Sequence, residues 1–173
     1  LGGLRMSAAP ASTLPRFGRV ALGLVALKLG LHLVVGLASP YEFHRDEFLY
    51  FAMGTHLQLF RMDFPPLIAL VSEALRGTLG VTVLTYRMVP ALAGCAVMLL
   101  AIAACREFGG GARAQWITAL AVLVSPLFLR TATLFQPVVL DQLWWMLGFL
   151  ALVRLERTGE PRWWLLLGVA AGL

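Results

Sequence analysis

The chain has 173 residues, of which 60% are apolar and 13% are charged. Soluble domains contain about 45–50% apolar and about 25% charged residues, and the apolar residues here fall in long runs. This composition excludes a soluble globular domain, a disordered tail and a coiled coil. The net charge of +5 comes from basic residues that flank the apolar runs, which is typical of membrane topology signals and not of nucleic-acid binding. We therefore expect an all-α, polytopic integral membrane protein.

Apolar runs predict four membrane spans, at residues 20–38, 88–105, 115–129 and 138–153. The run at 115–129 is short and needs Arg113 and Arg130 to extend toward the two interfaces. The first run is too long for a signal peptide and lacks a good cleavage site after it, so it is expected to be an uncleaved anchor. A last run, 163–173, has 11 residues, whereas a membrane-crossing helix needs about 20. We therefore expect this sequence to be the N-terminal part of a larger protein.

The distribution of basic residues predicts the orientation. Placing the tail, residues 1–19, in the cytoplasm puts eight arginines on that side and five on the other, in agreement with the positive-inside rule. The expected location is the plasma membrane, with segments 39–87 and 130–141 outside. Lys28 and His32 lie one helical turn apart in the first span, and we expect them to face the bundle interior or a partner helix.

The first outside segment, 39–87, is expected to hold two interfacial helices. One begins near Asp46, whose carboxylate is placed to cap free backbone N–H groups. The other begins near Pro66, because proline lacks an N–H that would be unpaired in a first turn. Its apolar face is predicted to consist of Leu67, Leu70, Val71 and Ala74, with Ser72, Glu73 and Arg76 on another face.

Acidic residues at a membrane boundary are costly unless they are solvated or paired, and they often mark a functional site. Asp46, Glu47, Asp63 and Asp141 are the candidates here. Each has a structural alternative, which the sequence leaves open. Asp46 and Glu47 fit a solvated helix start, Asp63 fits a turn before a Pro-Pro pair, and Asp141 fits a helix cap. His44 and His56 are compatible with ordinary interfacial polar residues.

Three sequence motifs resemble one known family. They are Phe43–Phe48, which contains an Asp-Glu pair; Met62–Leu67, which contains Asp63 and Pro-Pro-Leu; and the block from Phe135-Gln136-Pro137 to Asp141–Trp145. In this order, and all outside, they resemble the protein O-mannosyltransferase superfamily. Its bacterial branch, the glycosyltransferase family 39-like proteins, includes the aminoarabinose transferases of lipid A. The resemblance covers about residues 17–173.

The resemblance implies a GT-C fold, with many transmembrane helices and an active site formed by outside loops at the membrane surface. Residues 20–173 would be the N-terminal part of that domain, and this piece would be inactive alone. The implied enzyme moves a sugar from a polyprenyl-phosphate donor to an acceptor hydroxyl, with inversion. The implied partners are the lipid-linked donor, membrane lipid and an acceptor that is a glycan, a lipid or a protein.

The resemblance also implies roles for individual residues. Asp46 aligns with the catalytic acid and would be the general base, and Glu47 would orient it or bind the acceptor. Asp63 would contribute to an acceptor or divalent-metal site; no other cofactor is assigned. Phe64 stands where the aminoarabinose branch has a lysine, so the phosphate would need another cation. The candidate substrate-binding residues are Arg61, Arg87, Arg130, His44, Gln136 and Asp141.

Two other classes of function remain as alternatives. In a transporter fragment, Lys28, His32 and Asp141 would line a translocation path. In a membrane scaffold, the acidic residues would be dispensable. Transporters concentrate polar groups in broken spans near the midplane, whereas the polar motifs here cluster outside the spans. The sequence therefore favours the membrane glycosyltransferase.

Overall fold

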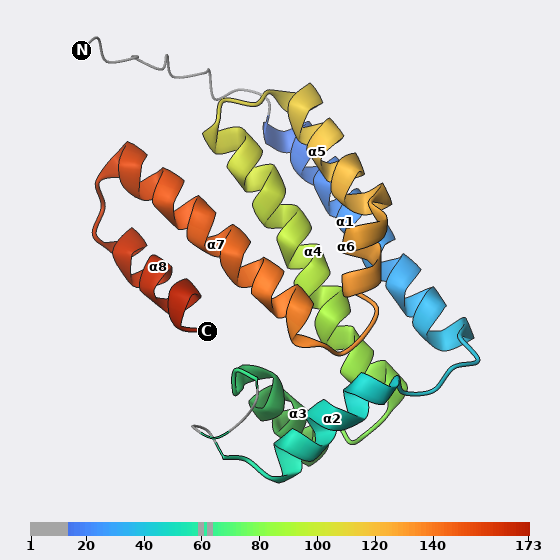
Figure 1. Cartoon of the computed structure of the whole chain (residues 1–173). Helices are drawn as coiled ribbons and strands as arrows, with labels where there is room; N and C mark the ends of the chain where they lie inside the picture. The colour runs from blue at the N-terminus through green and yellow to red at the C-terminus, as the bar shows by residue number, and fades with distance from the viewer. Residues whose placement is uncertain (1–13, 59–60, 62–63) are drawn as a thin grey trace.

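The computed structural model describes residues 14–58, 61 and 64–173, and in these ranges the chain is helical without strands (Figure 1). The helices, in chain order, are α1 (Leu14–Ala38), α2 (Arg45–Thr55), α3 (Leu67–Thr78), α4 (Val83–Glu107), α5 (Ala112–Val124), α6 (Pro126–Thr131), α7 (Pro137–Thr158) and α8 (Arg162–Gly172). The predicted all-α class is confirmed. The short helices α2 and α3 gather at one end of the bundle, which we call the α2 end.

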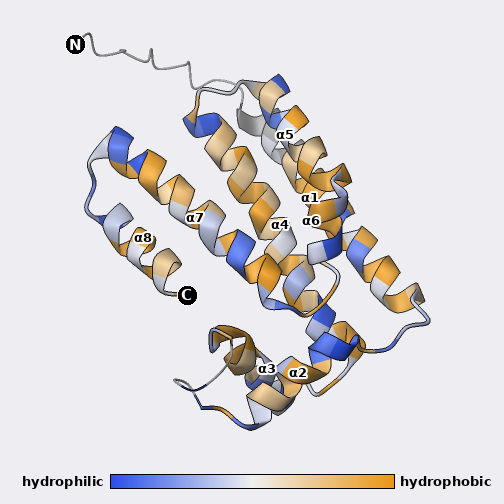
Figure 2. Ribbon diagram, in the orientation of Figure 1, coloured by the Kyte–Doolittle hydropathy of each residue, from blue (hydrophilic) through white to orange (hydrophobic). Residues whose placement is uncertain are grey.

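Three of the described helices are long and apolar enough to cross a membrane. They are α1 over Ala21–Ala38, α4 over Val83–Glu107 and α7 over Pro137–Thr158. Figure 2 shows the apolar residues along the bundle helices and hydrophilic residues at the start of α2 and at the far end of α7. The polytopic membrane architecture expected from the sequence is therefore present.

The predicted span 115–129 is not one helix. It is divided into α5 and α6 at Ser125, whose backbone is extended with φ −68° and ψ 122°. Pro126 explains the break, because proline disfavours helical geometry in the residue before it and cannot donate a backbone hydrogen bond. The two pieces are 13 and 6 residues long, and α5 alone is too short to span.

Helix α4 begins earlier than the predicted run, at Val83 and not at residue 88. Thr82 and Thr85 form a capping box there: the Thr82 hydroxyl accepts from the Thr85 N–H at 3.1 Å, and the Thr85 hydroxyl accepts from the Thr82 N–H at 3.2 Å. Such reciprocal bonds satisfy donors that a helix start leaves unpaired. The cap uses polar residues, which an apolar run does not reveal.

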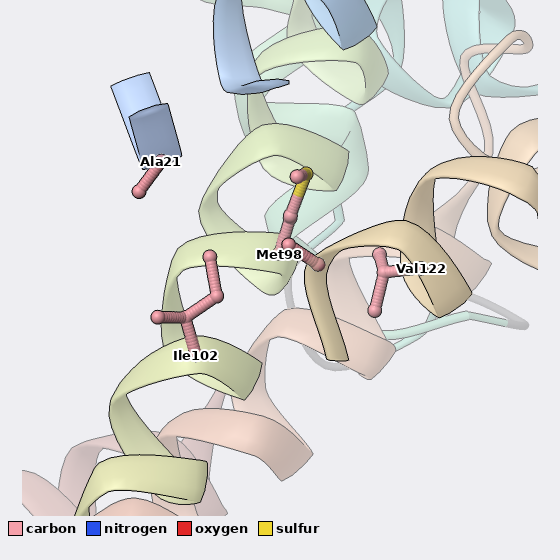
Figure 3. Packing of buried hydrophobic residues seen from close by; sticks show 5 residues of the cluster. Ala21, Met98, Ile102 and Val122 are labelled. Atoms are coloured by element: carbon pink, nitrogen blue, oxygen red, sulfur yellow. The ribbon is translucent and has the colours of Figure 1, made fainter. Parts of the chain in front are cut away.

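Small and medium-sized apolar side chains fill the space where α1, α4 and α5 meet. Ala21 of α1 and Val122 of α5 lie beside Met98 and Ile102 of α4 (Figure 3). Met98 is fully buried, and its flexible side chain suits an irregular gap between three helices. This packing holds α1 and α5 against α4.

Aromatic side chains form the core of the α2 end. Tyr86 of α4 is 1% exposed, and its ring centroid lies 4.4 Å from that of Phe51 and 5.0 Å from that of Phe135. Edge-to-face pairs of this kind contribute about 0.5–1.5 kcal/mol each beyond burial. The Tyr86 hydroxyl also donates to the Ser72 carbonyl oxygen of α3 at 2.9 Å. Tyr86 therefore ties α2, α3 and the segment before α7 to the start of α4.

The buried face of α3 differs from the prediction. Ile68, Ala69 and Ser72 are the buried residues, whereas Leu70 is 43% exposed and Ala74 is also exposed. Ser72 lies on the buried face because its backbone and side chain both bond the Tyr86 hydroxyl. A hydroxyl that finds a buried partner need not face water. Pro66 is the N-cap of this helix, which agrees with the expected helix start.

Candidate functional site

The start of α2 is held by His44 and Glu47, and not by Asp46 as the sequence suggested. The His44 ring nitrogen Nδ1 accepts from the Asp46 N–H at 3.3 Å, and a Glu47 carboxylate oxygen accepts from the His44 N–H at 2.6 Å. These two bonds form a capping box. The Asp46 side chain is therefore left free of the capping role that we had assigned to it.

Glu47 is a fully buried carboxylate at the centre of the α2 end. Its Oε1 accepts from the Phe135 backbone N–H at 2.9 Å, and its Oε2 accepts from the His44 N–H. Arg87 of α4 adds a longer contact, with Nη2 at 3.5 Å from Oε2. A buried carboxylate is tolerated when it is hydrogen-bonded and charge-paired. Glu47 meets both conditions by joining three segments that are far apart in the sequence.

Asp46 keeps an accessible carboxylate beside this buried centre. Its side chain is 38% exposed, and Oδ2 accepts from the Gln136 Nε2 at 3.2 Å. The same oxygen lies 3.6 Å from His44 Nδ1, and Oδ1 lies 3.4 Å from the Arg45 Nε. These neighbours restrict the rotamers of Asp46 and leave part of it open, which a group that takes up a proton from a substrate requires.

The first and third motifs therefore meet in space. Two hydrogen bonds, from Phe135 to Glu47 and from Gln136 to Asp46, span sequence separations of 88 and 90 residues. Both segments lie at the α2 end of the bundle (Figure 1). The sequence placed these segments on one side of the membrane, and their contact brings the candidate residues His44, Asp46, Glu47 and Gln136 into one cluster.

A cavity of about 450 Å³ adjoins this cluster, between the end of α1 and the segment after α6. One acidic residue, Glu42, lines it together with the basic residues His32, His44, Arg45, Arg87 and Arg130. Val35, Gly36 and Leu134 add apolar surface. Arginine side chains at such a cavity favour an anionic ligand such as a phosphate.

The two arginines that line the cavity and were predicted to bind phosphate have different surroundings. The Arg87 side chain is 11% exposed, and its Nη2 donates to the Glu42 carbonyl oxygen at 2.6 Å. Its Nε is buried and has no partner among the described residues. Arg130 lies in the last turn of α6 and is exposed. Arg130 is thus the more available cation, and Arg87 also holds the loop before α2.

Three other predicted site residues are not part of this cluster. Arg61 is exposed, and no side-chain bond joins it to the described cluster. Asp141 is exposed near the start of α7 and lines a different cavity of about 400 Å³, with Trp144, Trp145 and α8. It does not cap α7, whose N-cap is Gln136. Asp63 lies outside the described residues, and among the described ones no group of three or more His, Cys, Asp or Glu is placed to hold a metal ion.

Both polar residues of the first span are buried, and one of them lines the cavity. Lys28 is fully buried and His32 is 8% exposed, so both face the bundle interior as expected. His32 lines the cavity, although we did not assign it to the site. Its position as a polar residue in the outer part of the apolar run 20–38 was the signal that could have placed it there.

Tyr50 of α2 shows the electrostatic effect of the cluster. Burial raises the pKa of its hydroxyl, and the negative charge of Asp46 raises it further. The hydroxyl therefore stays protonated at neutral pH. Its ring packs edge-on against Phe64 and Phe135 at 5.7 and 6.5 Å, which adds to the apolar support under Asp46.

Comparison with known proteins identifies the family. Residues 63–173, more than half of the chain, match the family described as dolichyl-phosphate-mannose-protein mannosyltransferase. The match begins after α1 and after the Asp46–Glu47 pair of α2, so it rests on the part of the chain that holds α3 to α8. No curated protein and no solved structure matches the chain significantly. On this match and the apolar helices, the chain belongs to the dolichyl-phosphate-mannose-protein mannosyltransferase family and is a membrane glycosyltransferase of the mannosyltransferase type.

Proposed function

We propose that the protein transfers a sugar from a polyprenyl-phosphate donor to an acceptor hydroxyl at the outer face of the plasma membrane, with inversion at the anomeric carbon. The observation that carries this proposal is the contact between the Asp46–Glu47 pair and the Phe135–Gln136 segment beside a cavity rich in arginine. The excess of arginines around residues 1–19 and at the ends of α4 and α7 supports a cytoplasmic N-terminus and an α2 end outside.

Asp46 is the general base in this proposal. Its half-exposed carboxylate takes the proton of the acceptor hydroxyl as the hydroxyl oxygen attacks the anomeric carbon. The bond between that carbon and the phosphate oxygen breaks, and the polyprenyl phosphate leaves with the electron pair. Gln136 and His44, which bond or adjoin the Asp46 carboxylate, orient it toward the acceptor.

Arg130 and Arg87 stabilise the phosphate that gains negative charge as the sugar departs. Both line the cavity next to His44. Glu47 acts as a positioning residue because its carboxylate oxygens are already engaged by His44, Phe135 and Arg87. Asp63 keeps the acceptor or divalent-metal role, and Asp141 keeps the substrate-binding role, that the motif resemblance implies.

The transporter alternative has less support. The family match is to transferases, and the Lys28 amine is bound to the Phe128 carbonyl oxygen at 3.2 Å. A residue on a translocation path needs to exchange partners with the passing solute. The candidate site residues His44, Asp46, Glu47 and Gln136 instead gather at the α2 end, where a lipid-linked donor and an acceptor can meet.

The test of this proposal is the transfer activity of the Asp46→Asn variant in membranes that carry the full-length protein. We expect transfer of radiolabelled mannose from polyprenyl-phosphate mannose to fall about 10²–10⁴-fold, the usual contribution of a general base. Glu73→Gln is the matched control, because Glu73 is a carboxylate of the same segment that pairs with Arg76 away from the cavity. Near-normal transfer by Asp46→Asn would remove Asp46 from this role, and wild-type membranes that do not bind polyprenyl phosphate would contradict the donor class.

A further inference from the structure

Lys28 makes an unusual contact for a charged residue inside an apolar helix. Its side chain is fully buried, and its Nζ donates to the carbonyl oxygen of Phe128 in α6 at 3.2 Å. The bond joins two helices that are 100 residues apart in the sequence. Buried amines in a membrane bundle are costly and need a partner of this kind.

The Phe128 carbonyl is available because α6 ends one turn later. In a continuing helix it would accept from the N–H of Ala132, but that N–H points to the Arg130 carbonyl instead. The last carbonyls of a helix lack partners inside the helix and carry partial negative charge. The Lys28 amine therefore serves as the C-terminal partner of α6, supplied from another helix.

The segment that follows this bond forms one wall of the cavity. Arg130, Ala132, Thr133 and Leu134 all line it. The next residues, Phe135 and Gln136, donate the hydrogen bonds to Glu47 and Asp46. The Lys28 bond thus lies immediately before the part of the chain that carries one candidate phosphate-binding arginine and the partners of both acids.

Gly94 of α4 lies next to both Lys28 and Ala132, the residue that follows α6. A Cβ at Gly94 would lie 2.6 Å from the Ala132 Cβ and 3.4 Å from the Lys28 Cε. Real Cβ atoms do not approach so closely, and Ala132 is itself fully buried. Lys28 therefore binds the end of α6 from α1, and the absence of a side chain at Gly94 lets α4 lie close to both Lys28 and Ala132.

We propose that Lys28 is a positioning residue for donor binding, which fixes the end of α6 so that Arg130 and the 132–136 segment stand at the cavity. This inference rests on the proposed function, because it assigns the cavity to a lipid-linked phosphate. It extends the site into the first membrane span. Lys28 acts through the α6 end and does not touch the reacting atoms.

The experiment compares Lys28→Met, Arg130→Ala and the double variant in the full-length protein, with binding of polyprenyl phosphate and the KM and kcat of transfer as readouts. Methionine keeps the length of the side chain without its donor. We expect Lys28→Met to weaken polyprenyl phosphate binding and raise the donor KM about tenfold, as for loss of one charged hydrogen bond. The double variant should bind no more weakly than Arg130→Ala alone, because both changes remove the same interaction.

Gly94→Ala is a second way to displace the end of α6. It keeps Lys28 and pushes Ala132 away, so the donor KM should rise here too, whereas Gly30→Ala on α1, with open space around its Cβ, should leave KM unchanged. Unaltered donor KM in both Lys28→Met and Gly94→Ala, or fully additive losses in the double variant, would overturn the inference. Absence of polyprenyl phosphate binding by the wild type would overturn the proposed function instead, so the two failures are distinguishable.

Discussion

The two ends of the helical bundle each hold a glutamate that contacts arginine, but they use it differently. At the α2 end, Glu47 is fully buried, and two of its three partners are backbone N–H groups of separate segments. At the opposite end, the Glu107 side chain is 22% exposed and pairs with Arg154 and Arg157 of α7 at 2.8 Å each. The first arrangement fixes loops, and the second fastens two helices.

This difference distinguishes the candidate functional site at the α2 end from a structural ion pair at the opposite end. Arginine side chains are long and mobile, so their pairs at a surface hold helices together with little geometric precision. Backbone N–H groups cannot move without moving the chain, so a carboxylate that binds them fixes the path of each segment. The end that performs sugar transfer in our proposal is the one that has this stricter arrangement.

Glu47→Gln is expected to have the largest effect on stability and on transfer among the changes that test this difference between the two ends. The amide of glutamine has one acceptor oxygen, and its NH₂ group would face either the His44 or the Phe135 N–H. We expect a loss of about 3 kcal/mol in the free energy of unfolding, since breaking a buried charge pair has effects of this size, together with loss of transfer. Chemical unfolding in detergent measures the first quantity. Stability equal to the wild type would show that the Glu47 contacts do not hold the α2 end.

Glu107→Gln is the matched change at the opposite end. Its partners are side chains that retain contact with water, so we expect a loss of about 1 kcal/mol or less, with transfer activity unchanged. The same unfolding assay and the mannose transfer assay give both values. If Glu107→Gln reduced transfer as much as Glu47→Gln, the distinction between the two ends would fail.

Glu73→Gln is expected to have the smallest effect of the three glutamate substitutions. Glu73 and Arg76 are exposed neighbours on α3, and the hydrogen bond from Arg76 lowers the pKa of the Glu73 carboxyl. A lowered pKa in the folded state contributes stability above the ordinary carboxyl value, which is lost as the pH falls through the lowered value. Because water screens this surface pair, that contribution is small, and we expect no measurable change in unfolding at neutral pH or in transfer. A clear destabilisation would mean that α3 depends on this surface pair.

The sequence predicted the membrane helices well because apolar length alone determines them. Runs 20–38 and 138–153 lie wholly within α1 and α7. Helix α7 continues past the run to Thr158 and ends at Gly159, whose φ of +66° suits glycine. The run 115–129 failed at Pro126, since hydropathy does not register a missing N–H. The buried face of α3 failed because Ser72 has a partner, Tyr86, that the local pattern cannot contain.

The residues of the candidate site could be predicted from the sequence, but the hydrogen bonds among them could not. The motifs pointed to His44, Asp46, Glu47 and Gln136, which the fold brings together. The sequence did not show that Glu47 is buried and Asp46 is accessible, because this depends on where the Phe135 N–H lies. Lys28 and His32 were expected inside the bundle, but the bond of Lys28 to the end of α6 and the place of His32 at the cavity were not visible in the sequence.

The partners of Glu47 also determine when the site can form during synthesis. The bond to Phe135 joins residues 88 positions apart, so the ribosome releases α2 long before the chain that completes its setting. Until then one oxygen of the Glu47 carboxylate needs water, and the α2 segment is best kept at the wet surface of the bilayer. Long-range closures of this kind fold late. A nascent chain arrested before Phe135 would therefore contain both acids of the Asp-Glu motif and yet have no assembled site.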